Sequence, residues 1–457
     1  MSAVRAFFAF SAISISGLAL AAPLPPEKAR LIAHRGESLE APANGLEAFR
    51  LAFADGFGVA FEVALSPEGL VLTRPSPKTK PCGLDEALAL VPADVRIAFT
   101  TADDRGKVAA LVRAAIGRHP QIRMENVILP GEADLPFANA PDEAARLIAN
   151  GAKAVLSDSP RRLLMLWDEA FAEPPPKDPN AYRLMLFNIW GPFFGNPVAE
   201  REDGVVTTIL RESPDVVALQ ETTPEWWASG LFAKLTDDYG VVEGGWERTN
   251  NHHNPNPILY RKTAFEVVAS GREVFHWKLD YSKGYTWAIF REKATGRCFT
   301  AFSTHFWWRE NGQESDTIRL WDAEQLVRGL DRVRHIESTP VIGGGDFNAK
   351  FGSDALTYLF DRGFSDAQRI AKVSSPDTSW HDDPVRDWRG RYRGFVPRAN
   401  VAADQSLDHV IVSAGVEVLR QRIVRHPAAM DVSDHSPVVV DFALRENATG
   451  TLPARCL

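Results

Sequence analysis

The chain has few cysteines, and nothing regular in their spacing. Cys82, Cys298 and Cys456 are too few and too scattered for a zinc site or a disulfide framework. At most one disulfide can form, and an odd count in an exported chain leaves one thiol free or bonded to another molecule. The sequence leaves open which cysteines pair.

An excess of positive charge is also missing. The 457 residues include 51 Lys and Arg against 59 Asp and Glu, a net charge of −8 at pH 7. This balance argues against sequence-independent coating of DNA, which relies on Lys and Arg, but it permits an enzyme that binds a few phosphates locally. A hydrophobic content of 45% and a charged content of 24% exclude disordered, collagen and coiled-coil classes. No internal repeat is visible, which excludes solenoids and propellers.

Long apolar runs are absent after the first residues. Arg5 is followed by the apolar run 6–20, which ends in Ala19-Leu20-Ala21. The run is shorter than the roughly 20 residues of a membrane-spanning helix, and small residues close it, so residues 1–21 are interpreted as a cleaved signal peptide. We expect a secreted or periplasmic product without a transmembrane anchor. Its oligomeric state does not follow from the sequence.

The length indicates two domains, because single cores stop growing near about 250–300 residues. The proline-rich segment 172–180 (AEPPPKDPN) is the predicted linker, because successive prolines favour an extended spacer. Eleven of the twelve tryptophans follow it. The predicted domains are therefore 31–167 and 181–443, followed by a tail, 444–457.

Beyond the linker, short apolar runs rich in β-branched and aromatic residues alternate with stretches of helical spacing. The predicted strands are 183–189, 216–220, 258–261, 286–290, 299–304, 341–343, 409–413 and 437–442. The predicted helices are 204–212 and 317–335. This order favours an α/β fold in which two sheets pack face to face with helices outside.

Polar residues stand where several of these strands begin or end. Each one alone is more often a turn or cap residue. Together they form an oxygen-rich set of carboxylates, amides and histidines without cysteine. This set suits Mg²⁺ or Mn²⁺ better than it suits structural zinc. Such ions commonly bind substrate phosphate oxygens, and His and Asn can donate to those oxygens where negative charge develops. The set therefore indicates phosphoryl chemistry.

Six motifs make this set specific. In chain order they are Leu186-Phe187-Asn188, Leu219-Gln220-Glu221, Ser303-Thr304-His305, Gly345-Asp346-Phe347-Asn348, Leu407-Asp408-His409 and Ser433-Asp434-His435. Their order and spacing resemble the endonuclease/exonuclease/phosphatase superfamily over roughly residues 181–443. The resemblance implies a four-layered α/β sandwich and divalent-metal-dependent hydrolysis of a phosphate ester. The chain departs from the family pattern at His409, where an aromatic residue is commoner.

The resemblance also implies roles for residues. Glu221 would be the main ligand of Mg²⁺ or Mn²⁺, with Asn188 and Asp434 close to the ion. The implied catalytic residues are Asp346, which aligns or deprotonates water, Asn348 and His305, which hold the phosphate, and His435, which Asp408 orients. A carboxylate bonded to one imidazole nitrogen fixes the tautomer and stabilises the charged ring. Which histidine is the general acid stays open. Arg319 matches a basic position seen in some family members, but it is interpreted as a surface residue of the second predicted helix.

The first domain contains Ala33-His34-Arg35-Gly36 and a single acid, Glu62, before a glycine turn. It resembles a shortened, degenerate glycerophosphodiester phosphodiesterase, a family with a (β/α)₈ barrel, and about 140 residues are too few for a complete barrel. Ala60, Arg74 and Ala98 replace residues that the family uses for metal binding or catalysis. We expect a catalytically inactive, incomplete barrel, retained either for phosphate or glycerol phosphate binding or only for structure.

The substrate stays open between several classes. Trp388, Arg389, Arg391 and Arg393 alternate aromatic and basic side chains, which suits either a surface that grips phosphate and stacks bases or a solvated loop. A nuclease is the first expectation. The alternatives are a phosphodiesterase or phosphatase for a lipid head group or an inositol or sugar phosphate, and a non-catalytic phosphate-binding protein.

Overall fold

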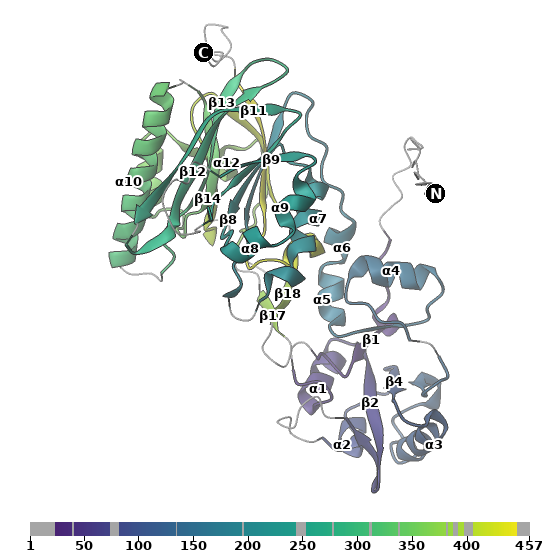
Figure 1. Cartoon of the computed structure of the whole chain (residues 1–457). Helices are drawn as coiled ribbons and strands as arrows, with labels where there is room; N and C mark the ends of the chain where they lie inside the picture. The colour runs from purple at the N-terminus through teal and green to yellow at the C-terminus, as the bar shows by residue number, and fades with distance from the viewer. Residues whose placement is uncertain are drawn as a thin grey trace, which may run out of the picture.

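The computed structural model describes residues 23–38, 41–73, 82–133, 135–193, 196–243, 253–276, 278–309, 313–336, 339–380, 383–386, 392–396 and 405–445. The predicted signal peptide and most of the predicted tail lie outside these residues. The chain forms an N-terminal domain, up to residue 171, and a larger sandwich domain from residue 181, which meet along one junction (Figure 1). Among the described residues, no helix combines the length and the apolar character that a membrane crossing needs.

The N-terminal domain is built on an open sheet of mostly parallel strands. Its order is β5-β4-β2-β1-β6, and β3 pairs antiparallel with β2. The strands are β1 (Leu31–His34), β2 (Gly58–Ser66), β3 (Gly69–Leu72), β4 (Ile97–Thr100), β5 (Val127–Ile128) and β6 (Val155–Ser157). The five parallel strands fall short of the eight of a closed barrel, as the incomplete barrel predicted from the sequence requires.

Helices cover this sheet and close its core. They are α1 (Leu46–Ala54), α2 (Leu84–Leu88), α3 (Arg105–Ile116), α4 (Pro141–Ala149), α5 (Pro160–Met165) and α6 (Trp167–Phe171). One apolar cluster joins the sheet to α1, α2 and α3, and a second joins it to α4, α5 and α6. Side-chain caps set where two helices begin: Asp104 accepts from the amide of Lys107 at the start of α3, and Ser159 accepts from that of Arg162 at the start of α5.

The sandwich domain contains two packed sheets. The first has the order β16-β20-β21-β7-β8-β10-β9, and the second β11-β12-β13-β14-β19-β15. The strands of the first are β7 (Tyr182–Asn188), β8 (Val216–Gln220), β9 (Tyr239–Val242), β10 (Ile258–Arg261), β16 (Val373–Ser374), β20 (Val416–Ile423) and β21 (Val438–Leu444). Those of the second are β11 (Phe265–His276), β12 (Asp280–Glu292), β13 (Cys298–His305), β14 (Val341–Asp346), β15 (Ser365–Asp366) and β19 (Asp408–Val412).

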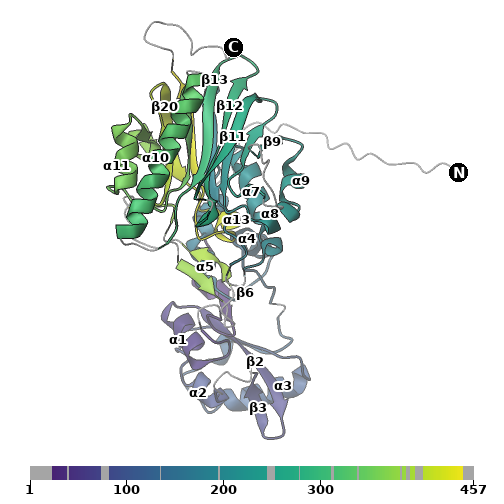
Figure 2. The same cartoon turned by 60° about the vertical axis from the view of Figure 1, so that its left-hand side comes forward.

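Helices lie on the outer face of each sheet. Those against the first sheet are α7 (Glu202–Glu212), α8 (Pro224–Ala228), α9 (Leu231–Leu235) and α13 (Pro427–Met430), whereas α10 (Gln313–Ile336) and α11 (Asp354–Asp361) pack on the second. Figure 2 shows the two helical layers on opposite sides. One apolar cluster fills the space between the sheets, and α12 (Ala367–Ile370) closes its edge. The predicted four-layered α/β sandwich is confirmed.

Strand β14 occupies a crowded position in the second sheet. It pairs parallel with β13 and antiparallel with β19, and it contains Gly343, Gly344 and Gly345. A Cβ atom on Gly344 would lie 1.9 Å from the carbonyl oxygen of His409, and one on Gly345 would lie 1.8 Å from that of Thr304. Glycine is therefore required there for the neighbouring strands to approach.

The proline-rich linker is attached to the sandwich domain along its length. Lys177 forms an ion pair with Asp215, and the Arg183 guanidinium donates to the carbonyl oxygen of Pro175 at 2.8 Å. Arg183 in turn pairs with Asp441 at 2.6 Å, and both side chains are buried. The segment therefore behaves as part of the sandwich domain. Of the cysteines, Cys82 is free, whereas Cys298 is disulfide-bonded.

His409, the departure from the motif pattern, forms a buried ion pair. Its Nδ1 lies 2.9 Å from Asp366 Oδ2, and its Nε2 lies 2.9 Å from the carbonyl oxygen of Ala349. Because both partners accept, both ring nitrogens must donate, so the ring carries a positive charge. Burial alone would lower the pKa of His409, but Asp366 and the Ala349 carbonyl raise it above its usual value of 6.5.

We expect this pair to stabilise the protein mainly at lower pH. Because the pKa of His409 is raised in the folded state, its stabilisation is complete below pH 6.5 and is lost as the pH rises through the raised pKa. Asp366→Asn should lower the free energy of unfolding by about 3–5 kcal/mol at pH 6, and by less at pH 9. Urea unfolding at both pH values measures the difference, with Asp361→Asn on the exposed end of α11 as the control. An equal loss at both pH values would contradict the charged ring.

Candidate active site

Strand pairing brings the motif residues to one end of the sandwich. Strands β7 and β8 run parallel, with Asn188 beside Gln220, and β13 and β14 run parallel, with His305 beside Asp346. The antiparallel pairing of β14 with β19 sets Asp346 beside Asp408. Residues far apart in sequence therefore meet because the registers of three strand pairs place them at the same edge.

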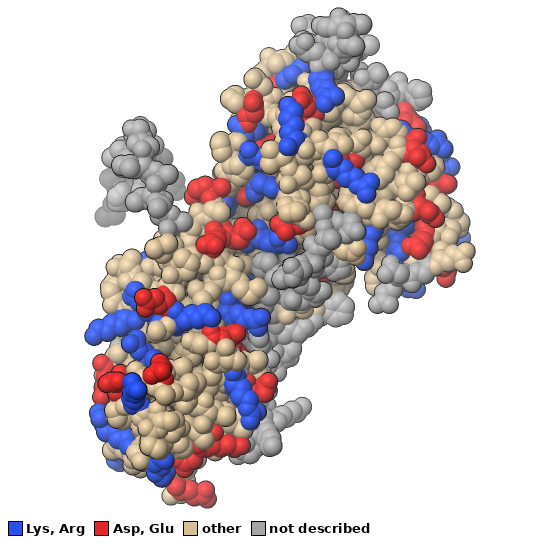
Figure 3. Space-filling model, turned by 180° about the vertical axis from the view of Figure 1, so that it is seen from behind, with Lys and Arg blue, Asp and Glu red and all other residues tan. Residues whose placement is uncertain are grey.

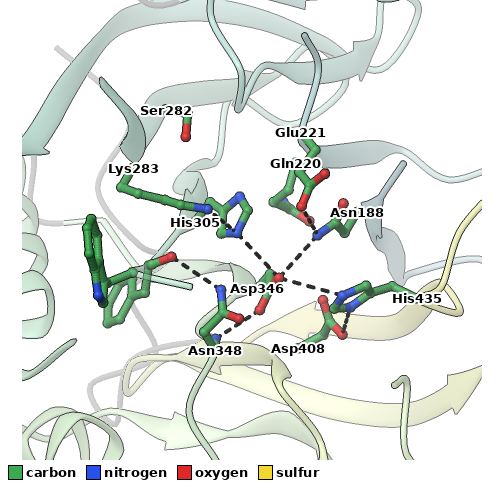
Figure 4. A network of polar contacts seen from close by, with 12 residues as sticks. Asn188, Gln220, Glu221, Ser282, Lys283, His305, Asp346, Asn348, Asp408 and His435 are labelled. Carbon is green, nitrogen blue, oxygen red and sulfur yellow. Dashed lines mark hydrogen bonds and ion pairs between the residues drawn. The ribbon is translucent and has the colours of Figure 1, made fainter. Parts of the chain in front are cut away.

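Asp346 lies at the centre of this site (Figure 4). Its Oδ2 accepts from Asn188 Nδ2 at 3.1 Å and lies 3.4 Å from His305 Nε2 and 3.7 Å from His435 Nε2. Its Oδ1 accepts from the backbone amide of Asn348 at 2.9 Å. Burial raises the pKa of Asp346 to about 6. A carboxyl group that titrates close to neutral pH is suited to proton transfer with water.

His435 is held by Asp408. Its Nδ1 donates to Asp408 Oδ2 at 2.7 Å, and Ser379 Oγ donates to the same oxygen at 2.6 Å. Burial alone would lower the pKa of His435, but Asp408, Asp346 and Asp434 together raise it well above its usual value. The ring is therefore protonated, and its Nε2 can donate a proton or a charged hydrogen bond to a phosphate oxygen.

Lys283 is a member of the site that the sequence analysis did not identify. It lies in β12, is buried, and places its Nζ 2.6 Å from His305 Nε2. Burial lowers the pKa of Lys283, while burial and the charges of Lys283 and His435 hold the pKa of His305 well below its usual value. His305 is therefore neutral. Lys283 precedes the predicted strand 286–290 and stands between Ser282 and Gly284, so no local sequence pattern could have found it.

Glu221 follows β8 in a backbone conformation that non-glycine residues seldom adopt, with φ of 57°. Its Oε1 accepts from Asn188 Nδ2 at 3.3 Å, and its Oε2 accepts from the backbone amide of Gly191 at 2.9 Å. Asn348, with φ of 48°, has the same left-handed conformation beside Asp346. Strained conformations of this kind persist where the surrounding structure holds a functional side chain in place.

Two sets of side chains could hold a metal ion. The first is the predicted set of Glu221, Asn188 and Asp434, in which burial and the charge of Glu221 raise the pKa of Asp434 to about 6. The second is Asp346, Asp408 and His435, whose ligand atoms lie within 4.8 Å of one another. A histidine must be neutral to bind a metal, and the acids around His435 keep it protonated. The oxygen donors around Glu221 therefore fit a hard divalent cation better.

The structure brings together all eight predicted catalytic and metal residues. Of the predicted substrate residues, Trp388, Arg389 and Arg391 lie outside the described residues, and for Arg393 only its backbone place in β18 (Tyr392–Val396) is described, opposite β17 (Asp383–Arg386). Arg319 corrects the sequence interpretation, because it is buried and not on the surface. Its guanidinium donates to the carbonyl oxygens of Trp307 and Arg309 at 3.3 and 3.0 Å, which fixes the segment after His305.

The chain is similar to several known proteins. The model of the Endonuclease/Exonuclease/phosphatase family matches residues 185–435, which is more than half of the chain. A solved endonuclease/exonuclease/phosphatase structure from Bacteroides vulgatus is 25% identical, with a TM-score of 0.47, over 58% of this chain and 99% of that chain. The human Nocturnin catalytic domain is 19% identical, with a TM-score of 0.44, over 58% and 94%.

A mannosyl-6-phosphatase from Bacteroides thetaiotaomicron is 18% identical, with a TM-score of 0.44, over 57% of this chain and 100% of that chain. No curated protein matches the chain. The family match lies within the sandwich domain and includes every residue of the site described above.

We expect Asp408→Asn to impair hydrolysis without unfolding the protein. The amide can no longer hold a proton on His435 Nδ1, so the charged ring is lost, and kcat should fall by about 10²–10⁴-fold. Ser379→Ala is the matched control, since it removes a second hydrogen bond to Asp408 but keeps the charge, and it should cost much less. Equal losses in the two variants would show that Asp408 acts only through local packing.

Proposed function

Because the chain belongs to the endonuclease/exonuclease/phosphatase family, whose members are metal-dependent phosphoester hydrolases, we propose that it is an exported nuclease that uses Mg²⁺ or Mn²⁺. In this proposal Glu221, Asn188 and Asp434 hold the ion, which polarises the phosphoryl group when it is bound. Asp346 takes the proton of the attacking water. Lys283, His305 and Asn348 bind the phosphate, and His435 Nε2 donates to an oxygen on which charge develops.

A cleft next to this centre supports a nucleic acid substrate. Its volume is about 510 Å³, and its walls carry the rings of Trp190, Phe193 and Trp308, with Lys283 and His305 beside them. Phe193 is 48% exposed and Trp308 is 56% exposed. Exposed aromatic rings beside a phosphate site are suited to stacking with nucleobases, since every base has a flat face. This cleft is the observation that carries the nuclease proposal.

A second candidate is hydrolysis of a phosphorylated lipid head group or an inositol or sugar phosphate. Lys283 is the only Lys or Arg among the described residues that line the cleft, which suits one phosphate better than a polyanionic backbone. On the face seen in Figure 3, Lys and Arg are interspersed with Asp and Glu and form no broad basic surface. The apolar exposure of Phe193 and Trp308 is also compatible with lipid contact.

For the N-terminal domain we propose no hydrolytic activity of its own. Ala60 and Ala98, which replace expected ligands, are fully buried, and Arg35 forms an ion pair with Glu62. His34 Nδ1 lies 3.1 Å from Asp158 Oδ1, a partner that the sequence analysis did not identify. Export is proposed on the N-terminal sequence pattern, and the appearance of the processed chain in the periplasm or medium would test it.

The substrate class can be tested with purified protein beginning at residue 22. We expect it to degrade DNA or RNA with Mg²⁺ or Mn²⁺ and to lose this activity with EDTA. Asp346→Ala should lower the rate by about 10²–10⁴-fold, because the acceptor of the water proton is gone. Phosphoinositides, sphingomyelin and inositol phosphates complete the panel. Intact nucleic acid together with turnover of one of these would replace the nuclease by the second candidate, and no hydrolysis of any substrate would favour a phosphate-binding protein.

We expect Trp308→Ala to weaken substrate binding. Loss of one stacked ring costs about 1–3 kcal/mol, which lowers kcat/KM by roughly 5- to 150-fold. Trp321→Ala is the matched control, because Trp321 is 51% exposed but lies on α10, outside the residues that line the cleft. Unchanged kcat/KM on the preferred substrate in Trp308→Ala would exclude this ring from recognition.

A further inference from the structure

The two domains meet at a junction near α5. A cavity of about 670 Å³ lies between them, lined from the N-terminal domain by Arg35, Asn139 and Asp158 and from the sandwich domain by Asn196 and Glu200. Beside this cavity the short helix α5 meets the hairpin β17–β18 (Figure 1). Arg162 of α5 lines the same cavity.

Arg162 of α5 makes polar contacts with the sandwich domain. Its side chain is buried, its guanidinium forms an ion pair with Asp431, and its Nε donates to the carbonyl oxygen of Phe395 at 3.3 Å. Gly394, with φ of 94°, packs directly on this pair, since a Cβ there would lie 2.6 Å from both Arg162 Nη2 and Asp431 Oδ1. One arginine of the N-terminal domain thus holds two separate segments of the sandwich domain.

An apolar cluster continues the contact toward the active site. Leu166, which follows α5, packs with Trp190, Phe395 and Met430 of the sandwich domain. Trp190 follows Asn188 by two residues, and its backbone amide donates to Asn188 Oδ1 at 3.0 Å. Trp190 therefore connects the junction directly to Asn188, one of the predicted metal ligands.

The segments on the sandwich side are tied to one another as well. Arg201 donates to the carbonyl oxygens of Ile189 and Val432 at 2.8 and 2.7 Å, and Ser433 Oγ donates to the carbonyl oxygen of Asn188 at 2.6 Å. These bonds join the segment after β7 to the segment that leads from Asp431 to Asp434 and His435. A shift of Asp431 should therefore displace the segments that carry Asn188 and Asp434.

We propose that Arg162 is a positioning residue, through which the N-terminal domain holds Asn188, Asp434 and His435 in the geometry needed for metal binding and hydrolysis. The N-terminal domain is then a working part of the active site, although it contributes no group to the reaction. This role depends on the proposed metal site but not on which phosphoester is cleaved. Groups bonded directly to metal ligands typically change metal affinity or activity by about 10–100-fold, and Arg162 acts on the ligands through further residues, so the lower end of this range is expected.

The test is a double-mutant cycle in the full chain with Arg162→Ala, Asp431→Ala and both together. Asp431 is 54% exposed on the sandwich domain, so its truncation should leave that domain folded. We expect each single variant to raise the Kd for Mn²⁺, measured by calorimetry without substrate, and to lower kcat, both by roughly tenfold. The double variant should be no worse than the more affected single variant, because the two side chains act through one another.

Arg113→Ala is the control, since Arg113 forms an exposed ion pair with Glu132 at 2.9 Å within the N-terminal domain. Arg113→Ala should change neither the Kd for Mn²⁺ nor kcat. The proposal is overturned if both single variants bind Mn²⁺ within twofold of the wild type, or if their effects add in the double variant. Should Arg162→Ala fail to fold, Asp431→Ala alone decides by the same twofold limit. If the wild-type protein binds no Mn²⁺ at all, the proposed metal site fails, and that result is separate from an unchanged Kd in the variants.

Discussion

The buried carboxylate of Asp346 is the interaction on which the site depends. A charge at the end of a packed sandwich is unfavourable unless donors surround it, and here Asn188, the protonated His435 and the Asn348 amide all face it. These donors come from three different chain segments. The registers of the two sheets must therefore all be correct before the carboxylate is satisfied, which links the fold directly to the chemistry.

The sequence was sufficient to predict the residues that interrupt a regular apolar pattern. Asn188, Glu221 and Asp346 could be predicted because polar residues at the ends of apolar strands need an explanation, and the two predicted helices lie within α7 and α10. Strands β9, β11 and β20 could not be predicted in the same way. Strand β11 is mostly half-buried and rich in polar residues, so its period is weak, and its place is decided by pairing with β12.

Other features depend on contacts that no local pattern encodes. Lys283 is unremarkable beside Ser282 and Gly284 in the sequence, and only its burial against His305 reveals a role. The ion pair of Arg162 with Asp431 joins residues 269 positions apart. Trp226 and Trp227 lie in the short helix α8, which Pro224 begins immediately after Thr223.

Strand β14 has a consequence for how this protein can change over evolutionary time. Its glycines touch the backbones of β13 and β19 so closely that no substitution can be absorbed by repacking of side chains. A compensating mutation would have to move a whole strand, and with it His305 or Asp408. New substrate preferences are therefore expected to arise in the loops that surround the cleft, while the strand that carries Asp346 keeps its sequence through such changes.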